Sequence, residues 1–181
     1  MEEIKKIVAK AVYGQDTQSF SKDIHVKTNE RKKPTEILGI IITDAEIVSC
    51  ALEENIKNDK AVRVNGTFDV HLWYALKGDT VVTKVSTKFS DIVMVYGQGA
   101  EKYMNEEVRA WIQKTPKCSG LSIIDGPEGP GVTATLEYEL GAEIVGQTTL
   151  SVKVFYTIDV SEEAPEILME NGEILDEYED D

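Results

Sequence analysis

The sequence predicts a mainly β protein: an antiparallel β-sandwich-like body with one or two short helices and a flexible acidic C-terminal tail. Three features of the 181 residues predict it. Residues 62–76 alternate strictly between apolar and polar side chains, as a strand with one buried face does. Residues 132–140 alternate in the same way. From residue 161 onward the chain is acidic, contains no Lys or Arg, and has few core-forming residues, which favours a flexible segment.

A short helix is expected near the N-terminus, because four apolar residues follow helical spacing behind an acidic first turn. These residues are Ile4, Ile7, Val8 and Ala11. Gly14 can end this helix, although residues 10–13 are equally compatible with an extended chain. From residue 20 the apolar period changes to two, which predicts a strand near residues 20–26 and, after Pro34, another at residues 37–43.

Residues 62–76 and 81–89 form the clearest predicted hairpin. The apolar face of its first strand consists of Val62, Val64, Phe68, Val70, Leu72, Tyr74 and Leu76. A four-residue loop, Lys77–Thr80, sets this face opposite the apolar face of the second strand, with Leu76 opposite Val81. A three-residue loop would set Leu72 opposite Lys84. Because a slip of one residue inverts every side chain, the four-residue loop is favoured.

A second hairpin is expected between residues 132–140 and 150–158, with Gly146-Gln147 as its two-residue turn. This turn alone would set Leu140 beside Lys153. A β-bulge at Gly141-Ala142 restores the apolar register and is therefore predicted.

Between the hairpins, a second helix is expected after Asn105, a good N-cap that acidic residues follow. Its apolar face would consist of Met104, Val108, Trp111 and Ile112. The helix would end before Pro116, and the Gly- and Pro-rich residues 125–131 would form a loop.

Charge divides the chain into two expected parts, a β-rich body at residues 1–160 and an acidic tail at residues 161–181. The whole chain carries 33 acidic against 19 basic residues, a net charge of −14. Ten of the acids lie in the tail: Glu162, Glu163, Glu166, Glu170, Glu173, Asp176, Glu177, Glu179, Asp180 and Asp181. The body is left near −4. No dense basic stripe remains for nucleic acid, and an anionic membrane surface would repel the chain.

The compartment is expected to be a cytosol, because the first residues contain no apolar signal segment and no apolar run is long enough to span a bilayer. Two cysteines, Cys50 and Cys118, cannot form the disulfide framework of a chain this long. One bridge and two free thiols both remain open, as does oxidative cross-linking between chains.

No catalytic residue, cofactor site or metal ligand is assigned from the sequence. Asp69 and His71 share one strand face and could form a general-base pair, but a solvent-exposed polar face accounts for them without any chemistry and no nucleophile motif accompanies them. The His and Cys residues lack the short-spaced pair typical of zinc sites. Trp73, on the same face as Asp69 and His71, is either a packing residue or an anchor for a partner.

Four segments resemble one known family, in order and at a similar total length. They are Lys32-Lys33-Pro34-Thr35-Glu36-Ile37-Leu38-Gly39, Val64-Asn65-Gly66-Thr67-Phe68-Asp69-Val70-His71-Leu72-Trp73-Tyr74, Thr115-Pro116-Lys117-Cys118 and Glu143-Ile144-Val145-Gly146-Gln147-Thr148. They resemble the outer spore coat morphogenetic protein E (CotE) family over roughly residues 1–158.

The resemblance implies a non-enzymatic scaffold of the bacterial endospore, without a cofactor. Such a protein is made in the mother-cell cytoplasm during sporulation, self-associates around the forespore and ends in the outer spore coat. It attaches to an inner coat basement-layer protein and recruits outer coat proteins. The tail would then be either a recruiting segment for basic partners or a solubilising extension. The alternative function is a β-sandwich that binds carbohydrate or peptide on the Trp73 face.

Overall fold

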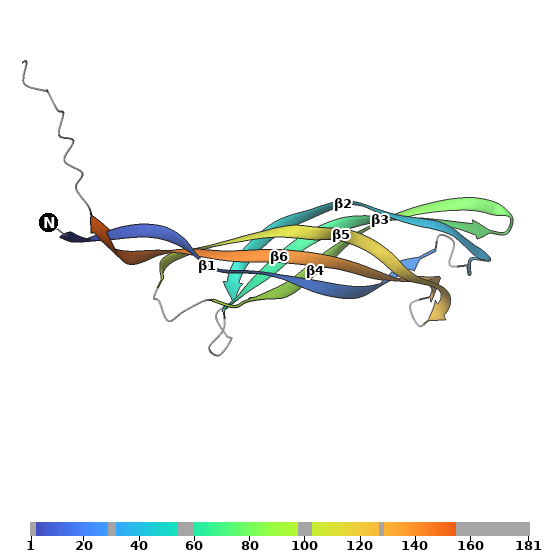
Figure 1. The fold of residues 1–181 in the computed structure, drawn as a ribbon. Helices are drawn as coiled ribbons and strands as arrows, with labels where there is room; N and C mark the ends of the chain where they lie inside the picture. Colours follow the sequence, from blue (N-terminus) through green and yellow to red (C-terminus); the bar gives the residue numbers. More distant parts are fainter. Residues whose placement is uncertain (1–2, 29–31, 54–59, 98–102, 127–128, 155–181) are drawn as a thin grey trace, which may run out of the picture.

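The computed structural model describes residues 3–28, 32–53, 60–97, 103–126 and 129–154. Every helix or strand in these residues is a β-strand (Figure 1). The six strands are β1 (Glu3–Lys27), β2 (Glu36–Glu53), β3 (Lys60–Leu76), β4 (Asp79–Val95), β5 (Met104–Gly126) and β6 (Gly129–Val154). The predicted mainly β class is confirmed.

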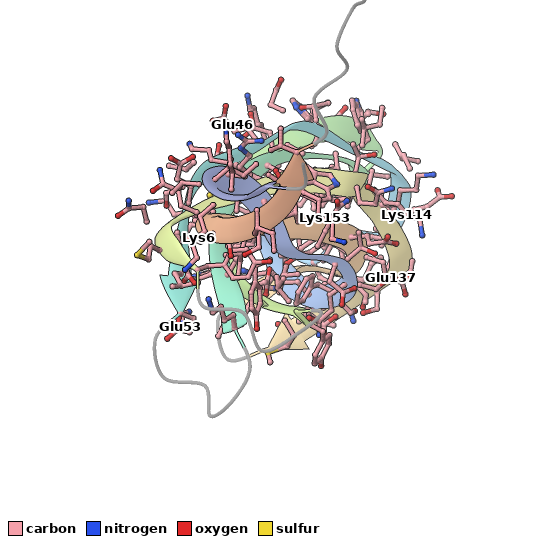
Figure 2. All side chains as sticks on the ribbon, turned by 60° about the vertical axis from the view of Figure 1, so that its left-hand side comes forward. Lys6, Glu46, Glu53, Lys114, Glu137 and Lys153 are labelled. Atoms are coloured by element: carbon pink, nitrogen blue, oxygen red, sulfur yellow. The ribbon has the colours of Figure 1, made fainter. Side chains whose placement is uncertain are left out.

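The strands form two three-stranded antiparallel sheets, ordered β1-β6-β5 and β2-β3-β4. The sheets pack face to face into an elongated sandwich, with β5 beside β2 along one side and β1 beside β4 along the other (Figure 1). Viewed from the end where β1 begins, Lys114, Glu137, Glu46 and Glu53 lie around the outside of the body (Figure 2).

The core lies between β3 and β6, the central strands of the two sheets. On β3 the predicted alternation is confirmed, because its apolar face from Val62 to Leu76 is buried. On β6 the residues from Val132 to Ile144 bury every second side chain in the same way. The hydroxyl of Tyr138 donates a hydrogen bond of 2.6 Å to Asp91 Oδ2, which ties the two sheets together inside the sandwich. Burial, and then this hydrogen bond, raise the pKa of Tyr138.

The β3–β4 turn is shorter than predicted. It consists of Lys77 and Gly78 alone, with Leu76 opposite Asp79 and Tyr74 opposite Val81. Both turn residues have positive φ, 54° and 91°, as a type I′ hairpin turn requires. The predicted register was wrong by two residues, a shift that leaves every side chain on its predicted face.

The predicted N-terminal helix is wrong, because residues 3–27 form β1, paired with β6 along its whole length. The apolar residues at helical spacing are largely β-branched, and such residues also favour strands. Pairing with the long partner β6 decided between the two conformations. The register of β1 shifts between Val12 and Gly14, which marks an irregularity in this strand.

The predicted helix after Asn105 is also wrong, because β5 spans it. Asn105 has a φ of 52°, a left-handed conformation that Asn tolerates better than most residues, at an irregular point of the strand. Pro116 lies where the register shifts between Lys114 and Lys117. Irregular positions and edge strands are the places where a sheet accepts proline, because its nitrogen donates no hydrogen bond.

The predicted second hairpin is a single strand. Residues 132–154 continue through Gly146-Gln147 without turning, and neither neighbour's register shifts at Gly141-Ala142, so the predicted turn and bulge are both wrong. Instead, Gly141 and Gly146 allow neighbouring side chains to approach the backbone of β6 closely. A Cβ on Gly141 would lie 2.2 Å from the Trp111 ring, and one on Gly146 would lie 2.7 Å from Tyr103 Cβ. Both glycines make room for aromatic side chains.

Candidate interaction surface

The outer face of the β2-β3-β4 sheet is built from the alternate side chains of β3 that point away from the core. Most of them are paired with neighbouring strands. Arg63 Nε donates to Glu53 at 2.8 Å, and Asn65 Nδ2 donates to Ser49 at 3.1 Å. Cross-strand pairs of this kind stabilise a sheet modestly. Over this part of the face, the polar groups are engaged within the sheet.

Asp69 is held by the neighbouring strand β4. Its carboxylate accepts a hydrogen bond of 2.5 Å from Ser86 Oγ and lies 2.6 Å from Lys84 Nζ. These partners, Lys84 first, hold the pKa of Asp69 below its ordinary value, and Asp69 in turn raises the pKa of Lys84. The carboxylate of Asp69 is therefore ionised at neutral pH and links β3 to β4 through Ser86 and Lys84.

His71 is held by β2, because its Nε2 lies 3.1 Å from Thr43 Oγ1. The hydrogen bonds of Asp69 and His71 therefore run to opposite neighbouring strands. The structure places these two residues and Trp73 together on one face of β3, as the alternation predicts.

Trp73 and His71 form the apolar part of this face. Their rings stack with centroids 6.2 Å apart and an interplanar angle of 26°. Val82 on β4 lies opposite Trp73, Ile41 on β2 lies opposite His71, and both aliphatic side chains are exposed. We call these four residues the Trp73 platform. On its other side Trp73 faces Gly39, where an added Cβ would meet no atom within 4 Å.

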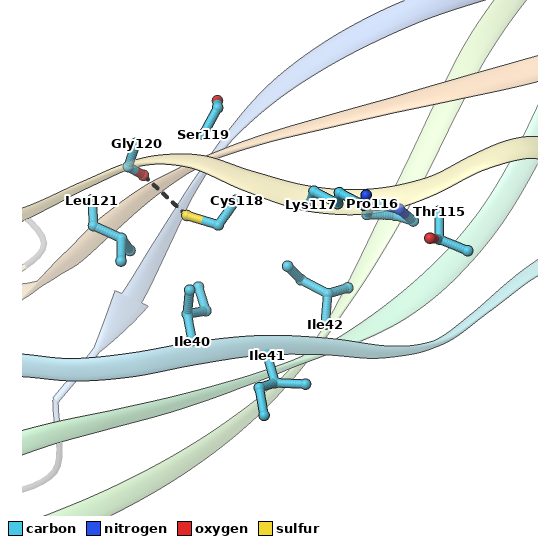
Figure 3. A pocket seen from close by; sticks show the side chains of 10 residues that line it. All are labelled: Ile40, Ile41, Ile42, Thr115, Pro116, Lys117, Cys118, Ser119, Gly120 and Leu121. Atoms are coloured by element: carbon cyan, nitrogen blue, oxygen red, sulfur yellow. Dashed lines mark hydrogen bonds between the residues drawn. The ribbon is translucent and has the colours of Figure 1, made fainter.

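Cys118 lies in β5, at an open groove of about 580 Å³ between β5 and β2. In Figure 3 its side chain projects toward β2, where Ile40 and Ile42 point into the groove and Ile41 points away from it. Its Sγ lies 3.3 Å from the Gly120 carbonyl oxygen. The sequence predicts a helix that ends before Pro116, but the structure places Cys118 in the interior of strand β5, where it is half-buried.

Cys50 lies in β2 and is also half-buried and free. Its Sγ lies 3.7 Å from the carbonyl oxygen of Val108. The stretch of β2 from Ile42, beside Cys118, to Cys50 spans about 25 Å at roughly 3.3 Å per residue. A disulfide tolerates a Cα separation of only about 7 Å. The two cysteines of one chain are therefore not placed to bridge each other.

Two further observations bear on the kind of site present. Within the described ranges, no group of three or more His, Cys, Asp or Glu side chains is placed to hold a metal ion. The same part of the chain contains no helix long and apolar enough to cross a membrane.

Sequence reasoning missed a group of exposed apolar residues on β1 and β6, because the N-terminal segment was predicted to be a helix. They include Ile4, Ile7, Val8, Val12 and Leu150. The signal that could have found them is composition, since Ile and Val are enriched in strands. The proposed recruitment tail, residues 161–181, lies outside the described residues.

Comparison with known proteins identifies the family. The family model for Outer spore coat protein E (CotE) matches residues 3–181. The chain belongs to the CotE family. The CotE resemblance of the four sequence segments is thereby confirmed, and the match covers the acidic tail as well. As a CotE family member the chain is an outer spore coat protein, of a structural rather than a recognised enzymatic family. No curated protein and no solved structure matches it.

Proposed function

We propose that this protein is a morphogenetic scaffold that self-assembles around the forespore and recruits other coat proteins. The family match across residues 3–181 carries the proposal. Its partners are further copies of itself, an inner coat basement-layer protein and the outer coat proteins. It is made in the mother-cell cytoplasm and then becomes part of the outer coat.

The open edges of the two sheets support self-assembly. β1 and β5 flank one sheet, and β2 and β4 flank the other. In the described part of the chain none of these outer edges continues into a further strand. Unpaired edges present backbone donors and acceptors to other strands, and proteins use them to add strands from partners.

The distribution of charge supports a division between assembly and recruitment. With a net charge near −4, the body at residues 1–160 repels copies of itself weakly. The tail carries ten carboxylates and no basic residue, so it would resist burial between copies and attract basic partner surfaces. Ile167, Leu168 and Met169 add apolar side chains that a partner can cover.

Cross-linking by cysteine is a further part of the proposal. Because Cys50 and Cys118 of one chain lie far apart, a disulfide would join different copies. Such bonds would form once the mother cell lyses and the surroundings become oxidising.

Light scattering and electron microscopy of the purified full-length protein test the assembly. We expect a molar mass that grows with concentration and ordered assemblies on the grid. A monomer at all concentrations, with no assemblies visible, would contradict the proposal.

A carbohydrate- or peptide-binding module is the second candidate, and the Trp73 platform favours it. Stacked aromatic rings flanked by exposed aliphatic side chains suit the face of a sugar or a hydrophobic peptide side chain. Glycan and peptide arrays probed with Trp73→Ala and with the unchanged protein test it. Loss of binding with normal assembly favours the module, and an unchanged array profile rejects it.

A further inference from the structure

The outer ends of β1 and β6 form a two-stranded arm. β5 begins pairing with β6 at Met104, opposite Gln147, so the pairs from Ile4–Lys153 to Ala9–Thr148 have no third strand among the described residues. Figure 1 shows this arm extending past the other strands at the N-terminal end of the molecule. Lys6 and Lys153 mark it in Figure 2. We call residues 4–9 and 148–154 the arm.

The arm exposes apolar side chains on both of its faces. On one face lie Ile7, 44% exposed, and Leu150, 38% exposed. On the other lie Ile4 at 68% and Val8 at 66%. A two-stranded ribbon alone is only marginally stable in water, and clustered exposed apolar residues mark contact sites. A partner that covers the arm would stabilise the ribbon and would bury its exposed apolar side chains.

One face of the arm continues the inner face of the sandwich. The even-numbered residues of β6 point inward through Leu140, Ala142 and Ile144. The register shifts beside Ile144, Val145 and Gln147 add their extra residues to β1 and β5 and not to β6. Side chains alternate along a strand, so Leu150, Val152 and Val154 extend the same face. The β6 part of this face is therefore apolar at Leu150, Val152 and Val154, and β1 adds Ile7 and Lys5 to the same face.

The two edges of the arm differ in charge. The β1 edge carries Lys5 and Lys6, and lysine on an edge strand discourages pairing with other strands. The β6 edge, Thr148–Val154, has one charged residue, Lys153, and four β-branched residues, without Gly or Pro. This composition is typical of segments that pair readily between chains. The β6 edge is therefore the edge of the arm that is better suited to pair with a strand of another chain.

We propose that the β6 edge of the arm pairs antiparallel with the same edge of a second copy, about a twofold axis at Ser151. Leu150 then lies opposite Val152 of the second copy, Thr148 opposite Val154, and Thr149 opposite Lys153. On the continued inner face Leu150 and Val152 meet in both halves of the pairing and Val154 meets Thr148, and no charge lies directly opposite a like charge. A register shifted by one residue would set the apolar face against the polar one.

The result is a four-stranded ribbon, β1-β6-β6-β1, that joins two bodies through their arms. The lysines of both β1 strands lie on its outer edges, away from each other. The contact is isologous and closes as a dimer, so the proposed self-assembly, on which this inference rests, would use the other sheet edges for growth.

Cysteine cross-linking tests the pairing and its axis. In full-length protein carrying Cys50→Ser and Cys118→Ser, Ser151→Cys places two thiols directly opposite each other. Directly opposed residues in an antiparallel pair have the Cα separation that a disulfide needs. We expect a covalent dimer on a non-reducing gel after mild oxidation. Lys6→Cys is the matched control, because residue 6 pairs with Ser151 within the arm but lies on β1, the strand at the other edge. No dimer with Ser151→Cys, or an equal yield with Lys6→Cys, would overturn the proposal.

A charge substitution tests the apolar face. Leu150→Lys sets an ammonium against Val152 of the second copy, so we expect the dissociation constant of the dimer to rise at least about tenfold. Val8→Lys adds the same charge on the opposite face and on the outer strand, and is expected to change association little. Analytical ultracentrifugation measures both. Leu150→Lys that associates like the unchanged protein would refute the arm contact.

Hydrogen exchange distinguishes between two possible occupants of the β6 edge of the arm: a second copy of the protein and the remaining residues of the same chain. Alternate amides of residues 148–154 point away from β1, toward the open edge, and protection of these edge amides that rises with protein concentration supports the second copy. Protection of the same edge amides that is independent of concentration points to residues 155–181 of the same chain and overturns the proposal. If the unchanged protein assembles while all three tests fail, only the arm contact is lost; a protein that never assembles contradicts the proposed function itself.

Discussion

At the scale of single residues, close contacts explain where the sheets require glycine. A Cβ on Gly66 would lie 2.2 Å from Phe89 Cζ and 2.4 Å from the Glu46 carbonyl oxygen. Phe89 is buried, stacks on Phe68 and belongs to the core cluster. The gap that Gly66 leaves in the apolar alternation of β3 is therefore filled by an aromatic ring from β4.

We predict that Gly66→Ala destabilises the protein by about 1–3 kcal/mol, because the buried ring and the backbone of β2 must both move. For a body of this size this corresponds to a fall of roughly 2–4 °C in melting temperature per kcal/mol. Gly39→Ala is the control. Its Cβ meets nothing within 4 Å, so it should leave the melting temperature nearly unchanged. Equal effects of the two substitutions would contradict the contact at Gly66.

The ion pair of Asp69 predicts how the stability of the fold depends on pH. The pKa of Asp69 is lowered in the folded protein, so its bonds to Lys84 and Ser86 stabilise the fold above the unfolded pKa of about 3.9. That contribution is lost as the pH falls through the folded pKa. We expect Lys84→Met to raise the pKa of Asp69, as followed by NMR of its carboxyl carbon, and Lys114→Met in the other sheet to leave it unchanged. An unshifted titration in Lys84→Met would reject the ion pair.

At the scale of elements, the β3–β4 turn shows how a hairpin and its register can be predicted separately. A two-residue and a four-residue loop place every side chain on the same face, so the apolar pattern alone does not distinguish them. Asn-Gly and Asp-Gly are the usual type I′ sequences, and Lys77-Gly78 departs from them at the first position.

The turn geometry predicts opposite effects at its two positions. Lys77→Asn should stabilise the protein by about 0.5 kcal/mol, since Asn adopts positive φ more easily. Gly78→Val should destabilise it by about 1–3 kcal/mol, because a β-branched residue at a φ of 91° is strained. Urea unfolding measures both. A neutral Gly78→Val would argue for the longer loop.

The strands β1 and β5 show why local spacing failed. Ile4, Ile7 and Val8 satisfy a helical face, and in the strand they lie on both faces of an exposed arm. Asn105 and Pro116 suggested the two ends of a helix, yet they occupy irregular points of an edge strand. In both segments the hydrogen-bonding partner was β6, whose length was hidden by Gly146-Gln147.

At the scale of the whole molecule, the proposed division of labour separates body from tail. We predict that ending the chain after Val160 leaves a folded body that still assembles but no longer captures basic coat proteins. The physical reason is the loss of ten carboxylates, which carry most of the net charge of −14. Pull-down of basic coat proteins at low and high salt measures it, with light scattering for assembly. Recruitment that survives the truncation would refute the division.

Cysteine chemistry adds a prediction between molecules. Oxidised assemblies should contain disulfides only between copies, because Cys50 and Cys118 of one chain are widely separated on β2 and β5. Peptide mapping under non-reducing conditions, with the protein mixed from isotopically light and heavy batches, identifies them. A disulfide between Cys50 and Cys118 from the same batch alone would contradict the fold at this side of the sandwich.

The sequence by itself determined the mainly β class, the inward faces of β3 and β4, the cluster of Asp69, His71 and Trp73 on one face, and the family. Each depends on a period of two along one strand or on residues close together in the chain. The tertiary structure decided that β1 and β5 are strands, that β6 runs unbroken, and that an arm extends beyond the sandwich. Those features depend on pairing between distant segments, because only a neighbouring strand supplies the hydrogen bonds that turn an ambiguous apolar pattern into a strand.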